Sequence, residues 1–141
     1  MFRTLDETIL VAGQISVDDV AAAAAQGVRT IINNRPDGEQ PGQPAAAEIE
    51  AAARAAGLGY VHIPVDHSGF SPEQVEAMTA ALALPAPALA FCRSGTRSTY
   101  LWSLARGAAG DAPAEIAAKA ANAGYDISGL MPVIESLRPK G

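Results

Sequence analysis

Four short apolar runs alternate along this chain with alanine-rich stretches, and this alternation constrains the fold more than any other feature of the sequence. The runs predict strands over residues 8–12, 28–33, 60–65 and 88–91. They consist largely of aliphatic and aromatic residues, which suit the buried, pleated backbone of a strand. A chain in which strands alternate with helices is typical of a parallel sheet covered by helices. We therefore expect an α/β fold with a mainly parallel sheet of four to five strands.

Capping residues mark where the helices begin. Ser16 precedes two acidic residues, and Ser71 precedes a proline and an acidic residue. A hydroxyl at the N-cap, proline at the first helical position and acidic residues in the first turn all favour a helix start. Two further helices are predicted over residues 113–124 and 128–137, with no strand between them. The C-terminal part should therefore be wholly helical.

The size and charge of the chain limit what it can bind. With 141 residues it is close to the commonest domain size, and we expect residues 1–141 to form a single domain. Its formal net charge of −5 argues against a general nucleic-acid binder, which needs a basic face. The arginines near the single cysteine suit a small anion better than a polymer.

The number of cysteines and the length of the apolar runs indicate where in the cell the protein is located. Because Cys92 is the only cysteine, the chain can form no internal disulfide, and a cysteine-based metal cluster within one chain is not expected. No apolar run resembles the core of a signal peptide or reaches the roughly 20 residues that span a bilayer. We expect a cytoplasmic protein without a membrane partner. No motif predicts a metal or an organic cofactor.

The segment around Cys92 carries the chemistry. It consists of an apolar strand, the polar loop Cys92-Arg-Ser-Gly-Thr-Arg97 and a helix. A thiol that faces a helix N-terminus and two arginines lies where a thiolate is favoured. Gly95 allows a positive φ, so that successive backbone N–H groups can turn inward around an anion. The guanidinium of Arg97 can hold two oxygens of a phosphate or sulfate.

These residues predict a nucleophilic site for a small oxyanion, although a lone cysteine at a strand end can also be an ordinary core residue. The Cys92 thiolate would attack the central atom of the bound group and form a covalent intermediate, with Arg97 as the clamp. The hydroxyl of Ser98 can donate to the sulfur. The residues expected to bind the anion are Arg93, Ser94, Gly95, Thr96 and Ser98.

Further candidates lie in the loops that follow the second and third predicted strands. Ligands of parallel sheets bind at the carboxyl ends of strands, so these loops should converge on the cysteine loop. Asp66 is the candidate acid that protonates a leaving oxygen, and His67 is the neighbouring alternative. Three charged residues can line the mouth of the site and contact the substrate or Arg97: Arg35, Asp37 and Glu39. Turn chemistry explains the Pro-Asp-Gly stretch among them equally well. His67 is a further candidate for the mouth.

Almost the whole chain resembles the phosphatase-like domain of beta-lactamase hydrolase-like proteins, a bacterial branch of the dual-specificity and tyrosine phosphatase fold. The matching stretches are Val11-Ala-Gly-Gln-Ile-Ser16, Gly27, Ile31-Ile-Asn-Asn-Arg-Pro-Asp-Gly-Glu39, Ile63-Pro-Val65 and the Cys92 loop with Leu101-Trp102. The resemblance implies a cysteine-phosphatase-like fold that acts on a phosphate ester. It also implies that Cys92 is the nucleophile, Arg97 the phosphate clamp, and Asp66 the loop aspartate.

The spacing within the cysteine loop departs from that resemblance. Cysteine phosphatases place five residues between cysteine and arginine and usually a histidine before the cysteine, whereas here the spacing is four and Phe91 precedes. The loop is instead similar to that of rhodanese-type sulfurtransferases, which carry sulfane sulfur as a persulfide. A rhodanese would have a further strand after the next helix, where this chain is helical. Phosphate-ester hydrolysis, sulfur transfer from a sulfane donor and non-catalytic anion binding remain the alternatives.

Overall fold

The computed structural model describes residues 2–139, so residues 1, 140 and 141 of the predicted domain lie outside the described part. It contains a five-stranded sheet in the order β1-β2-β5-β3-β4. Four strands run parallel, and β1 pairs antiparallel with β2. The expected α/β fold with a mainly parallel sheet is confirmed. The strands are β1 Arg3–Asp6, β2 Ile9–Ala12, β3 Thr30–Asn33, β4 Gly59–His62 and β5 Ala88–Phe91.

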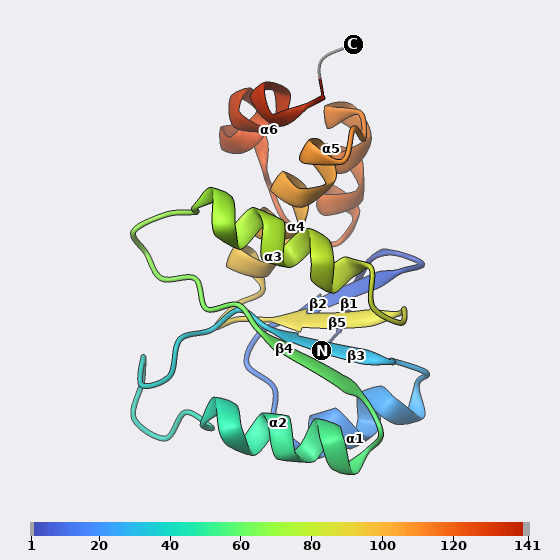
Figure 1. The fold of residues 1–141 in the computed structure, drawn as a ribbon, viewed down its shortest axis with the longest axis vertical. Coiled ribbons are helices and arrows are strands. Elements are labelled where there is room, and N and C mark those ends of the chain that lie inside the picture. Colours follow the sequence, from blue (N-terminus) through green and yellow to red (C-terminus); the bar gives the residue numbers. More distant parts are fainter. Residues whose placement is uncertain (1, 140–141) are drawn as a thin grey trace.

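Helices cover both faces of the sheet (Figure 1). On one face lie α1 (Val17–Ala25) and α2 (Ala46–Ala55), and on the other lie α3 (Pro72–Leu82) and α4 (Thr96–Ala108). The C-terminal part continues beyond α4 as α5 (Pro113–Asn122), the single turn η1 (Ser128–Leu130) and α6 (Met131–Leu137). This part is helical, as expected. Between residues 2 and 139, no helix combines the length and the apolarity needed to cross a lipid bilayer.

One strand was not expected, and three of the four predicted strands differ from the observed ones by one to three residues at their ends, most of all at the end of the third. The sequence did not predict β1, whose residues are mostly exposed apart from Leu5. This strand exists because its backbone pairs with the edge of β2, which places Arg3 opposite Val11. The third predicted strand ends at His62 instead of residue 65, since Pro64 has no N–H to continue the ladder.

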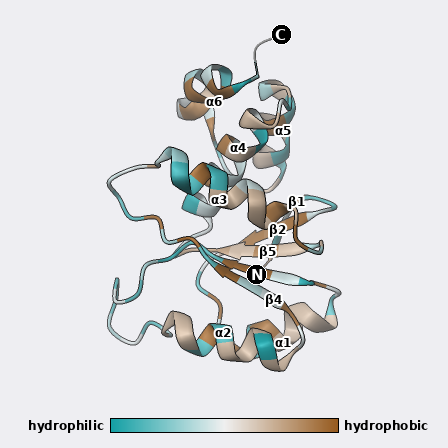
Figure 2. Ribbon diagram, viewed as in Figure 1, coloured by the Kyte–Doolittle hydropathy of each residue, from teal (hydrophilic) through white to brown (hydrophobic). Residues whose placement is uncertain are grey.

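The central strands bury side chains on both faces. Ile31 of β3 and Leu89 of β5 pack in one cluster with residues of α1 and α2, whereas Ile32 and Ala90 pack in a second cluster with α4. This alternation follows from the two-residue period of a strand. Figure 2 shows hydrophobic colour on strands of the sheet and on parts of the helices, and hydrophilic colour along the loops. The loops that follow β3 and β5 therefore begin at strands that are buried on both faces.

The predicted helix starts are confirmed by the capping geometry. The Ser16 hydroxyl accepts from the Asp19 N–H at 3.1 Å, and the Asp19 carboxylate accepts from the Ser16 N–H in return. Ser71 forms the same reciprocal pair with Gln74 at the start of α3. Each capping box satisfies two backbone donors that a helix start leaves free.

Candidate active site

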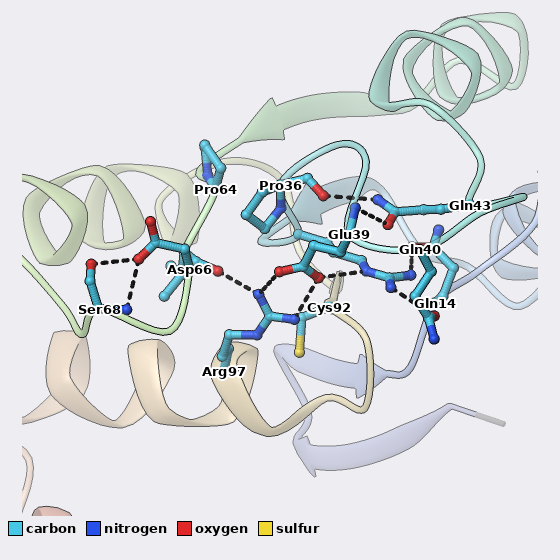
Figure 3. A network of polar contacts seen from close by, with 12 residues as sticks. Gln14, Pro36, Glu39, Gln40, Gln43, Pro64, Asp66, Ser68, Cys92 and Arg97 are labelled. Atoms are coloured by element: carbon cyan, nitrogen blue, oxygen red, sulfur yellow. Dashed lines mark hydrogen bonds and ion pairs between the residues drawn. The ribbon is translucent and has the colours of Figure 1, made fainter.

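Three loops meet at the carboxyl edge of the sheet, as expected for parallel strands. They follow β3, β4 and β5, which are neighbours in the strand order. Arg97, just after the β5 loop, donates from Nη1 to Glu39 Oε2 at 2.8 Å and to the Val65 carbonyl at 2.6 Å. Glu39 comes from the loop after β3, and Val65 from the loop after β4. Figure 3 shows the guanidinium of Arg97 between these two segments and beside Cys92.

Cys92 is held at the base of a short loop that leads into α4. It follows β5 directly, is 1% exposed, and its N–H donates to the Ala12 carbonyl at 3.4 Å. The N–H of Gly95 donates to the Cys92 sulfur at 3.1 Å. Gly95 is the N-cap of α4 and has a φ of +90°, which glycine adopts without strain. The sulfur therefore faces a helix N-terminus with one backbone donor already directed at it.

Some of the N–H groups of the Arg97 guanidinium bind other residues, and the rest face the cysteine. Nη1 donates to Glu39 and Val65, and Nη2 donates to Glu39 Oε1 at 2.9 Å. A guanidinium has five N–H bonds, and these contacts use three of them. The two that are left belong to Nε and Nη2, and no hydrogen bond to an oxygen of the described residues uses this open edge; the Cys92 sulfur is close enough to accept a hydrogen bond from the guanidinium. The hydrogen bond to Glu39 raises the pKa of Arg97, and the nearby Cys92 sulfur raises it further.

Glu39 lies between two arginines. Its Oε1 also accepts from Arg35 Nε at 2.8 Å. The hydrogen bond from Arg97, aided by the one from Arg35, lowers the pKa of Glu39 to about 2. A carboxylate with such a pKa is ionised throughout the neutral range and is a poor proton donor. Glu39 therefore contributes a fixed negative charge and a clamp for Arg97.

The other residues predicted near the mouth occupy different places. Arg35 is only 2% exposed and lies behind Glu39. Asp37 is exposed, and its Oδ1 accepts from the Ala46 N–H at 2.7 Å at the start of α2. His67 is exposed on the loop after β4.

Asp66 is turned away from the cysteine (Figure 3). Its Oδ1 accepts hydrogen bonds from the backbone N–H and the hydroxyl of Ser68. These bonds lower the pKa of Asp66, which is exposed to solvent. In this conformation the carboxylate is ionised at neutral pH and lies outside the loop. Beside it lies an open pocket of about 480 Å³, lined by Pro36, Pro64, Asp66, Ser68, Gly69, Phe70, Ser71 and Gln74.

The remaining loop residues divide into exposed and buried ones. Arg93 and Ser94 are exposed, and Ser94 Oγ donates to Thr96 Oγ1 at 3.0 Å. Ser98 is fully buried, and its hydroxyl oxygen has no hydrogen-bond partner among the described residues. The expected bond from Ser98 to the sulfur is therefore not formed in this structure. Within residues 2–139, no three His, Cys, Asp or Glu side chains gather closely enough to hold a metal ion.

The sequence matches the family of the phosphatase-like domain of beta-lactamase hydrolase-like proteins over residues 1–111. The chain belongs to this family. It is 39% identical over 101 residues to the beta-lactamase hydrolase-like proteins of Agrobacterium fabrum and Xylella fastidiosa. The match covers 71% of this chain but only 23% of those proteins, so the domain spans about a quarter of its curated relatives.

Solved structures share the fold of this phosphatase-like domain. A candidate phosphatase from Neisseria meningitidis is 33% identical, with a TM-score of 0.83 and coverage of 96% of this chain and 97% of that one. PTPMT1 is 16% identical with a TM-score of 0.75, and the match covers 97% and 93% of the two chains. The catalytic core of the PP-IP phosphatase SIW14 from S. cerevisiae is 14% identical with a TM-score of 0.68, at 98% and 85% coverage. The domain therefore has a cysteine-phosphatase-type fold.

Two residues that contact the cysteine loop of the phosphatase-like domain are absent from the predicted site residues. Tyr125 donates from Oη to the Ser94 carbonyl at 3.0 Å, and Gln14 donates from its backbone N–H to the Arg93 carbonyl at 3.3 Å. Gln14 falls within the family-like stretch 11–16, which is a signal that could have identified it. Tyr125 follows α5 and looks like part of a helix-to-helix turn, so no local pattern relates it to Cys92.

Proposed function

We propose that this domain is a cysteine-dependent phosphatase that forms a covalent phosphoenzyme on Cys92. The observation that supports this most directly is the open edge of Arg97. Its Nε and Nη2 have two N–H groups left for an acceptor, and they lie beside a sulfur at the N-terminus of α4. Two parallel donors suit two oxygens of a phosphoryl group, and the helix N-terminus favours the negative charge of the third.

The reaction has two displacements. In the first, the Cys92 thiolate attacks phosphorus, a sulfur–phosphorus bond forms, and the ester oxygen leaves with the bonding electron pair and takes up a proton. In the second, the oxygen of a water molecule attacks phosphorus, the sulfur leaves as a thiolate, and inorganic phosphate is released. Arg97 and the Gly95 N–H stabilise the charge that develops on the phosphoryl oxygens and on sulfur.

Asp66 is our candidate for the acid that protonates the leaving oxygen. Its carboxylate now bonds to Ser68, so a rotation of the loop at 66–69 has to bring it towards Cys92 and release those bonds. The release would also allow the pKa of Asp66 to rise from its lowered value.

A direct test uses 4-nitrophenyl phosphate as a generic substrate. We expect turnover that is lost in Cys92→Ser, and a phosphorylated cysteine detected by mass spectrometry after rapid acid quenching. Arg54→Lys, on the exposed surface of α2, is the matched control and should retain full activity. An absence of turnover over a broad pH range in the folded wild-type protein would refute the proposal.

A second function is favoured by one specific observation, the four-residue spacing between Cys92 and Arg97. In sulfur transfer the Cys92 thiolate attacks the outer sulfur of thiosulfate, the sulfur–sulfur bond of the donor breaks and sulfite leaves. The product is a persulfide on Cys92. Mass spectrometry after exposure to thiosulfate separates the two reactions, because a sulfurtransferase gains one sulfur atom on Cys92 and a phosphatase stays unmodified.

A further inference from the structure

The buried guanidinium of Arg35 has no part in the proposed reaction, and its burial requires a reason. It is 2% exposed and is the one charged side chain among the buried residues that the structure describes. Moving a charge out of water is unfavourable unless hydrogen bonds and an opposite charge compensate it. A buried arginine beside the candidate site therefore points to a role that an apolar side chain could not fill.

Each nitrogen of the Arg35 guanidinium is oriented by a different residue. Nε donates to Glu39 at 2.8 Å, Nη1 to the side-chain oxygen of Gln14 at 3.0 Å, and Nη2 to that of Gln40 at 2.9 Å. Among these three partners only Glu39 carries a negative charge. The two glutamines therefore orient the Arg35 guanidinium without neutralising it, and its positive charge pairs with Glu39 alone. The planar fork of arginine meets these three acceptors in one geometry, which lysine cannot do.

The partners of Arg35 hold both ends of the cysteine loop. The backbone N–H of Gln14 donates to the carbonyl of Arg93, which follows Cys92 directly. At the other end, Glu39 binds two nitrogens of Arg97. Arg35 thus links Arg93, the second residue of the loop, with Arg97, the last, through its contacts with Gln14 and Glu39.

We propose that Arg35 is a positioning residue that acts through Glu39 and Gln14 to keep the open edge of Arg97 directed at the anion. It also balances charge. With Arg35 in place, the single charge of Glu39 is shared between two guanidinium groups, which leaves a net positive charge facing the loop. Without it, Glu39 would neutralise Arg97. The anion-binding part of this inference rests on the proposed function, whereas the orientation of Arg97 does not.

The test separates position from charge by comparing Arg35→Lys with Arg35→Met. Lysine keeps the charge and loses the fork, and methionine loses both. The first readout is the ¹⁵N heteronuclear NOE of the Arg97 Nε–H group, which reports its mobility and needs no substrate. The second is the affinity for inorganic phosphate, measured by titration calorimetry. Arg54→Lys is the matched control, because Arg54 also pairs with a glutamate four residues away but is exposed.

We expect a rigid Arg97 Nε–H in the wild type and in Arg54→Lys, and a mobile one in both Arg35 variants. Phosphate affinity should fall about tenfold in Arg35→Lys, the size of effect typical of groups that orient ligand-binding residues, and further in Arg35→Met. Gln40 is exposed, so Gln40→Ala should fold normally and loosen Arg97 to a smaller extent.

An Arg97 Nε–H that stays as rigid in Arg35→Lys and Gln40→Ala as in the wild type overturns the positioning role. Circular dichroism must show that each variant is folded before it is compared. A wild-type protein that binds phosphate but hydrolyses no ester refutes the proposed phosphatase while the NOE result still decides the role of Arg35. The two inferences therefore fail separately.

Discussion

At the scale of single residues, the site depends on charges that neutralise one another. Glu39 accepts from Arg35 and from Arg97, and its side chain is 17% exposed. Because both arginines stabilise the ionised carboxylate, the pKa of Glu39 falls from 4.5 to about 2. A group whose pKa is lower in the folded state than in the unfolded state stabilises the protein at a pH above its unfolded pKa. This contribution is lost as the pH falls through the folded value.

The pH dependence of folding should report this pair of contacts. We expect the free energy of unfolding of the wild type to fall by roughly 2 kcal/mol more than that of Glu39→Gln between pH 5 and pH 2. Above about pH 5 the difference between the two proteins should be constant, because Glu39 is then ionised in both the folded and the unfolded states. Urea denaturation at a series of pH values measures it. Parallel pH profiles would show that Glu39 titrates normally.

Asp66 gives a second prediction at this scale. A general acid matters most for a poor leaving group, since a good one departs without a proton. Asp66→Asn should therefore slow hydrolysis of an alkyl phosphate about 100-fold and that of 4-nitrophenyl phosphate much less. Steady-state kinetics on both substrates measure the contrast, and His67→Gln, which removes the alternative acid, is compared in the same way and should not show it. An equal loss on both substrates would argue against Asp66 as the acid.

At the scale of elements, the β5–loop–α4 unit places Cys92 beside Arg97. The loop can turn this tightly because Gly95 has a positive φ and no side chain. A Cβ at this position would collide with the Tyr125 hydroxyl. Tyr125 lies beyond α5, so the C-terminal helices support the loop from outside the strand and helix that carry it.

Gly95→Ala should therefore destabilise the fold and abolish activity. Gly27 is the matched control, since its φ of +97° is similar and a Cβ there would meet nothing within 4 Å. The positive φ alone should cost on the order of 1 kcal/mol in each variant. Any excess in Gly95→Ala measures the collision with Tyr125. Thermal unfolding and 4-nitrophenyl phosphate turnover provide the readouts, and equal effects in the two variants would mean that the loop adapts.

Tyr125→Phe isolates the support that the C-terminal segment gives to the loop. It removes one hydrogen bond, to the Ser94 carbonyl, and leaves the ring in place. We expect a loss of about 1 kcal/mol in stability and a several-fold weaker phosphate affinity. Calorimetric titration with phosphate measures the second effect. Tyr100→Phe, whose hydroxyl bonds to the Asp126 carbonyl and not to a residue of the cysteine loop, is the control and should bind phosphate normally.

At the scale of the whole molecule, the C-terminal helices share a core with the sheet. Ile116 of α5 and Ile134 of α6 are buried in the same cluster as Ile32 and Trp102. The family match ends at residue 111, yet these helices complete that cluster. We therefore expect sheet and C-terminal helices to unfold in one cooperative transition.

Ile116→Ala tests this shared core. The side chain is 1% exposed, so its truncation should lower the free energy of unfolding by about 2–5 kcal/mol. The transition should stay single when followed by the fluorescence of Trp102 and by far-ultraviolet circular dichroism. Two separate transitions would show that α5 and α6 fold independently of the sheet.

Much of this architecture can be predicted from local patterns. Ser16 and Ser71 cap helices through contacts three residues away, and the central strands show their two-sided burial as continuous apolar runs. The strand at Arg3–Asp6 could not be predicted, because its residues form a strand only by pairing with the edge of β2. The third predicted strand ends at His62 because Pro64 follows. The proline is visible in the sequence, but the apolar residues on both sides of it made the run look like a continuous strand.

The sequence by itself determined that a cysteine, a glycine and an arginine lie within six residues between a strand and a helix. This follows from local patterns, because the apolar run before Cys92 and the helix-forming residues after the loop are adjacent to it in the chain. Only the tertiary structure decided which groups act on that loop from elsewhere: Glu39 and Val65 on Arg97, Tyr125 on Ser94, and Arg35 from the interior. These contacts join segments that are far apart in the chain, and they form only once the parallel strands bring their carboxyl ends to one edge.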